Sequence, residues 1–190
     1  MRPAEGTDAL SVREGRARYF EAWGLGEGGY AARWVRLRVF GLPVGFPNSA
    51  GRVRAVKLHD LHHVATGYAA DWIGEAEIGA WEVGAGCHGH AAAWILNLLA
   101  MQYGFFLAPR RVLRAMARGR RSRTLYRMRE LDESLLDRTV GELRRELGLD
   151  GEPPEPRVAD MLALAAWMAA SAALWLGPGA LLLGLRAALA

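Results

Sequence analysis

The segment His59-Asp60-Leu61-His62-His63 constrains the fold of this chain more than any other stretch, because its side chains can act together only on a regular helix. Residues 53–64 are predicted to be helical, since Asn48-Ser49 can cap a helix start and Gly67 can end it. Residues four apart share one face of a helix, so His59 and His63 are expected to lie about one turn apart. His62 then points elsewhere.

A second helix is predicted to follow at residues 72–83, with Asp71 as its N-cap. Glu75 and Glu82 lie on one stripe of this helix. The loop between the two helices is short, so the helices should be neighbours. Glu75 is therefore expected to face the two histidines.

Two imidazoles with one or two carboxylates predict a site for a divalent metal ion. Asp60 follows His59 by about 100° around the helix, so its carboxylate can lean into the same site. The candidate ligands are His59, Asp60, His63 and Glu75. Glu82 is a candidate general base or supporting group. Zinc is the first choice, with iron or magnesium as alternatives, and open positions on the ion could activate water. The plainer alternative is that the histidines are ordinary packing residues.

The order of these residues, with eleven positions between His63 and Glu75, resembles the motif of the coenzyme Q (ubiquinone) biosynthesis protein 4 family. The flanks agree with that family as well, through Thr66-Gly67, Gly74, Arg118–Leu125 and Val140–Gly148. The likeness covers residues 15–150.

This resemblance implies an all-helical protein that binds a divalent metal ion at the motif and acts on a polyprenylated quinone precursor at a membrane. The family is associated with oxidative decarboxylation at ring carbon 1 of the precursor, which replaces a carboxylate by a hydroxyl group. It has also been viewed as a non-catalytic scaffold for the other quinone-pathway enzymes. Two departures bear on this choice: Arg129–Glu133 lacks the family's aromatic residue, and an apolar tail follows residue 150.

The rest of the sequence also favours helices, so the predicted class is all-α, with one compact multi-helix domain over residues 1–150. Further helices are expected at 8–23, 30–40, 91–107 and 134–147, and a loop at 41–47, where prolines and glycines oppose a helix. Cys87 is the single cysteine, so no intramolecular disulfide can form. Cys87, His88 and His90 match no common zinc spacing, so a second metal site there is not favoured. The first 30 residues carry no visible secretory signal.

Residues 110–129 contain nine arginines and no acidic residue, in a chain whose net charge is +4. Nucleic-acid binding is not expected, because no helix-turn-helix or aromatic ladder accompanies them. One interpretation is a basic surface that faces anionic lipids. The other is a solvated face of an arginine-rich protein.

An apolar tail, residues 158–190, follows a proline-rich linker at 151–157. Residues 161–185 carry no charge, and one helix of that length would span about 37 Å, enough for a bilayer core of about 30 Å. Gly177-Pro178-Gly179 would give either a kinked single span or a helical hairpin. Nine arginines at residues 110–129 precede the tail and only Arg186 follows its uncharged part, so the positive-inside tendency would keep the main domain on the cytoplasmic side. In a soluble protein, the tail would instead fold onto its own domain or a partner.

The favoured function is therefore metal-dependent oxidative decarboxylation of a quinone precursor, and the alternative is a prenyl-lipid-binding scaffold. A metal-dependent phosphohydrolase ranks last, because only His62, His88 and His90 remain to complete its ligand set. The expected partners are the prenylated precursor or another prenyl lipid, the membrane and other quinone-pathway proteins. The chain could also form a homodimer.

Overall fold

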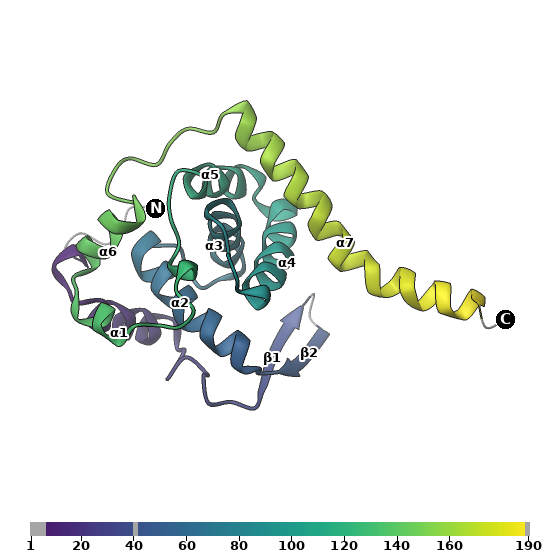
Figure 1. Cartoon of the computed structure of the whole chain (residues 1–190), viewed down its shortest axis with the longest axis horizontal. Helices are drawn as coiled ribbons and strands as arrows, with labels where there is room; N and C mark the ends of the chain where they lie inside the picture. Colours follow the sequence, from purple (N-terminus) through teal and green to yellow (C-terminus); the bar gives the residue numbers. More distant parts are fainter. Residues whose placement is uncertain (1–6, 40–41, 189–190) are drawn as a thin grey trace. The chain divides into compact units, whose positions relative to one another are not determined.

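The computed structural model describes residues 7–39 and 42–188, which Figure 1 traces. Helices dominate: the described residues form seven α-helices and one two-stranded sheet, which confirms the all-α class. The chain divides into two compact units. The first unit contains residues 1–67, 87–93 and 124–150, and the second contains residues 68–86, 94–123 and 151–190. The predicted domain boundary at residue 150 stays a prediction.

The first unit is built on α2 (Ala50–Thr66), which packs against α1 (Val12–Trp23) and α6 (Val140–Leu147). The apolar sides of these helices form its core, which includes Val12, Leu58, Leu61, Val140, Leu143 and Leu147. Three short 3-10 turns complete the unit: η1 (Thr7–Ala9), η2 (Leu125–Arg127) and η3 (Glu133–Asp137).

Side-chain caps fix where the helices of the first unit begin. α1 and α6 both open with a capping box, in which Ser11 or Thr139 accepts a backbone N–H and a glutamate three residues later reaches back. Thr139 starts α6 at Val140, so the helix predicted for 134–147 is shorter than expected and η3 precedes it. A backbone bridge between Ser11 and Thr139 ties the two helix starts together.

The predicted capping residues of α2 are confirmed, but the helix, Ala50–Thr66, is longer than the predicted 53–64. Ser49 accepts the N–H of Arg52 at the start, and Gly67 ends the helix in the left-handed conformation with φ of 76°. α2 thus begins before residue 53 and carries its histidines near its C-terminal end.

The helix predicted at 30–40 and the loop predicted at 41–47 were wrong, because this region contains a β-hairpin. Strands β1 (Trp34–Val39) and β2 (Leu42–Pro47) pair antiparallel, with Val35 opposite Phe46. The physical reason lies in the period of β1, where arginines alternate with apolar residues and so separate onto the two faces of a strand. Proline is tolerated in β2 because a strand of a two-stranded sheet has an open edge.

The second unit brings α3 (Trp72–Ala85), α4 (Ala91–Leu107) and α5 (Pro109–Gly119) close together (Figure 1). Glycines permit this packing. A Cβ on Gly104 of α4 would lie 2.0 Å from the Cβ of Ala76 in α3. A Cβ on Gly119 of α5 would lie 2.1 Å from the carbonyl oxygen of Trp81. The helices therefore approach at points where only a hydrogen fits between them.

α7 (Val158–Ala188) belongs to the second unit and is fixed near its start by the carboxylate of Asp160, which is 1% exposed. Asp160 accepts hydrogen bonds from Arg120 Nε at 2.9 Å, from an Arg121 Nη at 2.8 Å and from the backbone N–H of Arg157 at 2.8 Å. Burial raises the pKa of Asp160, but these hydrogen bonds and the charge of Arg121 outweigh it and hold that pKa below its ordinary value. Because Arg120 and Arg121 directly follow α5, the ion pairs join α5 to α7.

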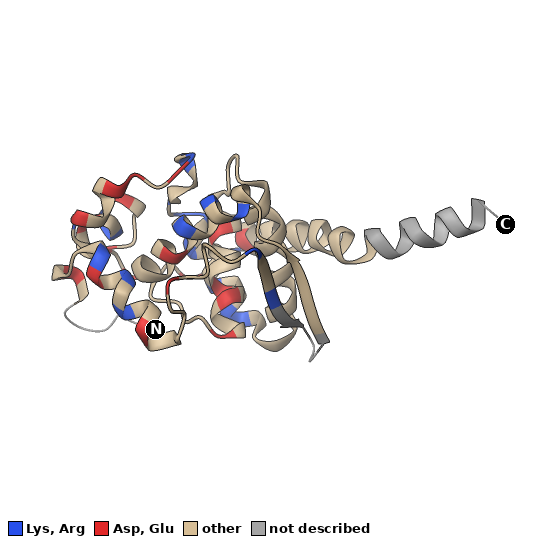
Figure 2. Ribbon diagram, turned by 90° about the horizontal axis from the view of Figure 1, so that it is seen from below, with Lys and Arg blue, Asp and Glu red and all other residues tan. Residues whose placement is uncertain are grey.

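The backbone of α7 continues through Gly177-Pro178-Gly179, so the helical-hairpin interpretation is wrong. Among the described residues, one segment, Val158–Leu176, is long and apolar enough to cross a membrane. Only 17% of its most apolar window is buried in the structure, whereas the core helix of a soluble protein is mostly buried. Figure 2 shows how few charged residues the described part of α7 carries.

Several arginines of residues 110–129 are engaged inside the second unit. Arg111 pairs with Glu77 through two hydrogen bonds, and Arg118 lies over the ring of Tyr68. Together with the two arginines on the α7 carboxylate, they account for four of the nine. The basic stretch is therefore partly structural, rather than a uniformly solvated face.

We expect Gly104→Ala to lower the free energy of unfolding by about 1–3 kcal/mol, because the new methyl group overlaps Ala76 unless α3 and α4 separate. Urea unfolding in detergent micelles, followed by circular dichroism, measures the change. The matched control is Gly51→Ala in α2, where the nearest heavy atom is the flexible end of Arg54 at 3.8 Å. Equal destabilisation by both variants would contradict the close approach.

Replacing Asp160 by Asn should destabilise the second unit by about 1–3 kcal/mol at pH 7, because two arginines lose a buried acceptor. The folded-state pKa of Asp160 is lowered, so its contribution is present above the unfolded pKa of about 3.9 and is lost as the pH falls through the folded value. The gap between variant and wild type should therefore narrow in acid. Asp150→Asn, at an exposed position, serves as the control. A gap that is constant with pH would argue against the ion pairs.

Candidate metal centre

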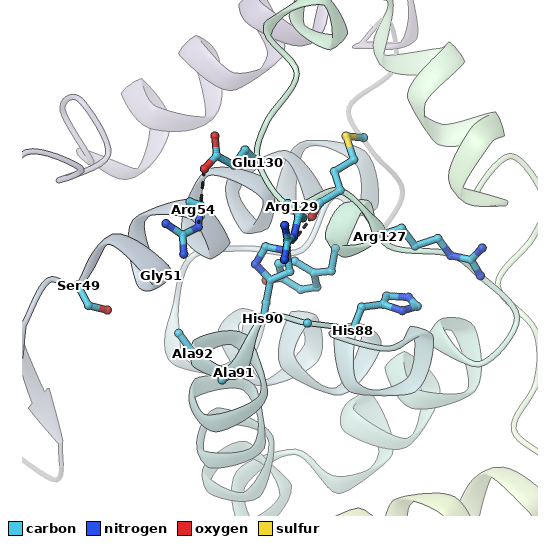
Figure 3. Close-up of a pocket in the computed structure, with 13 residues that line it drawn as sticks. Ser49, Gly51, Arg54, His88, His90, Ala91, Ala92, Arg127, Arg129 and Glu130 are labelled. Carbon is cyan, nitrogen blue, oxygen red and sulfur yellow. Dashed lines mark hydrogen bonds and ion pairs between the residues drawn. The ribbon is translucent and has the colours of Figure 1, made fainter.

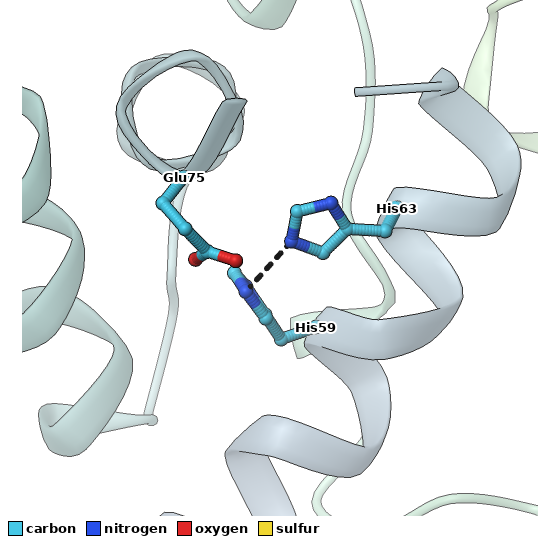
Figure 4. A group of neighbouring side chains, drawn as sticks. All are labelled: His59, His63 and Glu75. Carbon is cyan, nitrogen blue, oxygen red and sulfur yellow. Dashed lines mark hydrogen bonds between the residues drawn. The ribbon is translucent and has the colours of Figure 1, made fainter. Parts of the chain in front are cut away.

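His59 and His63 lie on one face of α2, as their spacing predicts. Their Nε2 atoms are 3.1 Å apart, and the rings cross at 84° with centroids 4.6 Å apart (Figure 4). His63 is buried and His59 is partly exposed. The pair therefore sits at the edge of the core, with one imidazole accessible from outside.

Tyr19 of α1 orients the buried member of the pair. Its ring stacks on the His63 imidazole, with centroids 5.1 Å apart and planes inclined by 19°. Since the start of α1 is tied to that of α6, the stacking surface comes from a fixed helix. The orientation of the His63 ring is thus set by packing.

Asp60 accepts a hydrogen bond from the hydroxyl group of Tyr30 at 2.5 Å. Burial, followed by the negative charge of Asp60, raises the pKa of Tyr30, so the phenol stays protonated and remains a donor. Burial also lowers the pKa of Arg52, and the charge of Asp60 opposes that change. Asp60 therefore has an established partner beside the histidine pair, and its assignment as a metal ligand stays a prediction.

Asn48 fastens the loop that carries Tyr30. Its side-chain amide donates to the carbonyl oxygens of Gly29 at 3.2 Å and Ala32 at 2.8 Å. Its oxygen accepts a hydrogen bond from Arg52 at 2.9 Å. Sequence reasoning proposed Asn48 or Ser49 as the cap of α2; Ser49 caps the helix, while Asn48 holds the preceding loop.

Glu75, in the first turn of α3, completes a group of three. One ligand atom from each of His59, His63 and Glu75 lies within 4.8 Å of the others. Figure 4 draws the carboxylate of Glu75 turned toward the ring nitrogens. Among the described residues, this is the one group of three or more His, Cys, Asp or Glu side chains that could hold a metal ion, and Asp60 is not a member.

Glu82, the candidate general base, lies outside this group. It is completely buried within the second unit and accepts a hydrogen bond from the side-chain amide of Asn97. A buried carboxylate needs such a donor, because an unpaired one would lose its hydration without compensation. Its role as a base stays a prediction.

His62 faces a different environment from His59 and His63. It is completely buried, its Nε2 accepts the backbone N–H of Leu125 at 2.8 Å, and its ring meets Tyr126 edge-on. Because Nε2 is an acceptor, the proton of the neutral ring sits on Nδ1. His62 therefore joins α2 to η2, as a structural residue.

The three residues around the start of α4 have separate surroundings. Cys87 is buried, and His88 is exposed with φ of 44°. His90 donates from Nε2 to the carbonyl oxygen of Met128 at 2.8 Å. His90 thus holds the chain after η2 against the start of α4.

Sequence reasoning missed the tyrosines and Asn48 because their partners are distant in the chain. Tyr30 is thirty positions from Asp60 in the sequence. Tyr19 contacts His63, although the β-hairpin separates the two residues along the chain. The repeat of a helix or strand in the sequence relates only nearby residues, so it does not reveal such contacts. Asn48 stands directly before the helix cap Ser49 in the sequence. A polar residue at this position also suggests a cap, so the sequence did not reveal that Asn48 holds the preceding loop.

Comparison of the chain with protein-family models, with curated proteins and with solved structures finds no match.

We expect His62→Ala to lower the free energy of unfolding by about 2–4 kcal/mol, because it leaves the buried N–H of Leu125 without its acceptor and opens a cavity. Thermal unfolding measures this. His88→Asn is the control, because its position is exposed and Asn tolerates a positive φ. A stable His62→Ala protein would refute the structural role.

Proposed function

We propose that this protein binds a divalent metal ion through His59, His63 and Glu75 and acts at a membrane on a prenylated quinone precursor, by oxidative decarboxylation at ring carbon 1. The observation that carries the proposal is the convergence of these three side chains within 4.8 Å. The order of the same residues supports it, through the resemblance to the coenzyme Q biosynthesis protein 4 family.

The distances suit a metal ion with modest adjustment. Two nitrogens at about 2.0–2.1 Å from one ion lie about 3.3 Å apart in tetrahedral and about 2.9 Å apart in octahedral geometry. The Nε2 atoms of His59 and His63 are 3.1 Å apart, between those values. The 4.8 Å limit of the full group exceeds both values. A change in the side-chain torsion angles of Glu75 could bring its carboxylate to ligand distance.

A competing explanation needs no metal ion. Two neutral imidazoles at 3.1 Å can share one hydrogen bond, with one ring donating and the other accepting. A carboxylate can also accept a hydrogen bond from an imidazole N–H, so this explanation accommodates Glu75 as well. A cation would satisfy all three groups at once, which is why we favour it.

The proposed reaction sets clear chemical requirements. Replacing a ring carboxylate by a hydroxyl group consumes one water, releases carbon dioxide and one proton, and gives up two electrons. A separate two-electron acceptor, such as dioxygen or a quinone, must therefore take part. When bound, the metal ion would supply Lewis acidity toward the carboxylate or phenolic oxygens of the ring.

The chain's own residues have defined roles in this proposal. The partly exposed ring of His59 marks the side from which the aromatic ring of a substrate can approach. Tyr19 keeps the His63 imidazole in one orientation, and the Tyr30 hydroxyl does the same for Asp60. Such outer contacts restrict the ligands before an ion arrives.

Membrane association is supported by α7 and by a groove beside it. The groove has a volume of about 560 Å³, and its lining is almost entirely apolar: Phe105, Pro109, Arg110, Leu113, Met161, Leu164, Ala165 and Met168. A prenyl chain fits such a surface, with Arg110 available to an anionic head group. We propose that the uncharged described part of α7, residues 161–176, enters the bilayer and that Asp160 and the arginine-rich part stay outside it on the cytoplasmic side.

The same groove favours the second candidate function, a non-catalytic scaffold that binds prenyl lipids and organises other quinone-pathway proteins. In that case the metal ion would only hold helices together. Turnover of a carboxylated precursor by the purified protein, supplied with metal and an electron acceptor, separates the two functions. Product formed without partner proteins would exclude the pure scaffold.

We expect His63→Ala and Glu75→Gln to reduce bound metal from about one ion per chain to a trace, and to abolish quinone production in cells that depend on this protein, because each removes a ligand. Elemental analysis of protein purified from membranes and mass spectrometry of the lipids provide the two measurements.

His88→Asn, outside the group of three, is the matched control and should leave both values unchanged. Normal quinone levels with metal-free His63→Ala protein would rule out the catalytic role. Unchanged metal content in both ligand variants would rule out the site itself.

A further inference from the structure

A second cavity lies within the first unit, separate from the candidate metal ligands. Its volume is about 940 Å³, and Figure 3 draws its lining. Three segments form it: the start of α2, the turn before α4 with the first residues of that helix, and η2 with the chain that follows it. None of His59, His63 and Glu75 lines it.

The lining of this cavity is strongly basic. Arg54, Arg127 and Arg129 are among the lining residues, and Glu130 is the one acidic residue in the lining. Arg54 Nε is 4.0 Å from Glu130, and both side chains are largely exposed. An exposed pair at that distance is weak, so Arg54 can turn to another anion at little cost.

The backbone adds to this positive field. Ser49 and Gly51 line the cavity at the start of α2, and Ala91 and Ala92 line it at the start of α4. The first N–H groups of a helix have no partner within the helix and carry a partial positive charge. The first turn of α4 begins with three alanines, so its own side chains offer no acceptor there.

Side-chain contacts tie the segments around the cavity together. His90, at the start of α4, donates to the carbonyl oxygen of Met128 at 2.8 Å, and its ring packs against Tyr126 at 5.0 Å. Tyr126 in turn meets the buried ring of His62. Arg127, in η2, and Arg129, after it, therefore belong to a stretch of backbone that these contacts hold next to two helix starts.

We propose that this cavity binds a phosphate-bearing ligand, either a soluble phosphate ester or diphosphate, or the phosphate of a lipid head group. Guanidinium groups match phosphate oxygens geometrically, and helix starts add backbone N–H donors to the same anion. The volume exceeds what a single phosphate needs, so the cavity has room for a ligand that carries a further group. This inference stands independently of the metal-dependent reaction.

The test uses the full chain in detergent micelles without added metal, titrated with inorganic diphosphate and followed by calorimetry. We expect saturable binding that weakens with added sodium chloride. Arg54→Gln and Arg129→Gln should each weaken it by about tenfold, the loss expected for one charge-assisted hydrogen bond.

Glu130→Gln should change the affinity for diphosphate in the opposite direction. It removes the one acidic group from the lining, so diphosphate should bind several-fold more tightly. Misfolding would weaken binding in every variant, and so cannot imitate a pair of opposite effects. Arg114→Gln, at an exposed position on α5 outside the cavity, should leave the affinity unchanged.

Vesicles distinguish the source of the phosphate. Binding is compared between phosphatidylcholine vesicles with and without phosphatidic acid. An increase that disappears in the Arg54→Gln, Arg129→Gln double variant assigns the site to a lipid head group. Diphosphate binding without such an increase assigns it to a soluble ester.

The proposal is overturned if diphosphate shows no saturable binding and phosphatidic acid produces no increase that depends on these arginines. It is equally overturned if Arg114→Gln weakens binding as much as Arg54→Gln does, because the effect would then reflect net charge alone.

Discussion

The pairing of His59 and His63 depends on the integrity of α2. Ser49 and Gly67 fix the two ends of that helix, and the helical period then places the imidazoles on one face, 3.1 Å apart at their Nε2 atoms. The same period turns His62 the other way, into the core. One capped helix therefore carries a histidine pair that lies close to Glu75 and a fully buried histidine that bonds to the backbone of Leu125, and every proposal about the site relies on this division.

In both units, several buried polar groups find their hydrogen-bond partners far away in the chain. In the first unit, the N–H of Leu125 meets His62, and the hydroxyl of Tyr30 meets Asp60. In the second unit, Asp160 collects two arginines and so attaches α7 to the end of α5. Each contact removes the cost of burying an unpaired group, and each also fixes an element next to a candidate site.

The arginines have divided roles. Some neutralise buried or half-buried acids in the second unit, as Arg111 does for Glu77. Others, such as Arg54 and Arg129, line a cavity in which acidic residues are outnumbered. A sequence rich in arginine and poor in lysine does not reveal this division, because the side chains are identical and only their neighbours differ. The neighbours decide which arginines remain available to an anionic ligand.

The sequence by itself determined the helices whose caps and periods are local: α2 between Ser49 and Gly67, α3 after Asp71, and α4 at its predicted limits. It also determined which side of α2 carries the His59–His63 pair. Only the tertiary structure decided the partners of Asp60 and Glu82, and the arginines that Asp160 binds, since hydrogen bonds between distant residues leave no periodic trace. The hairpin of β1 and β2 lies between these cases. The alternation of arginines and apolar residues in β1 is visible in the sequence, but the same residues can also form a helix, and strand pairing decides between the two.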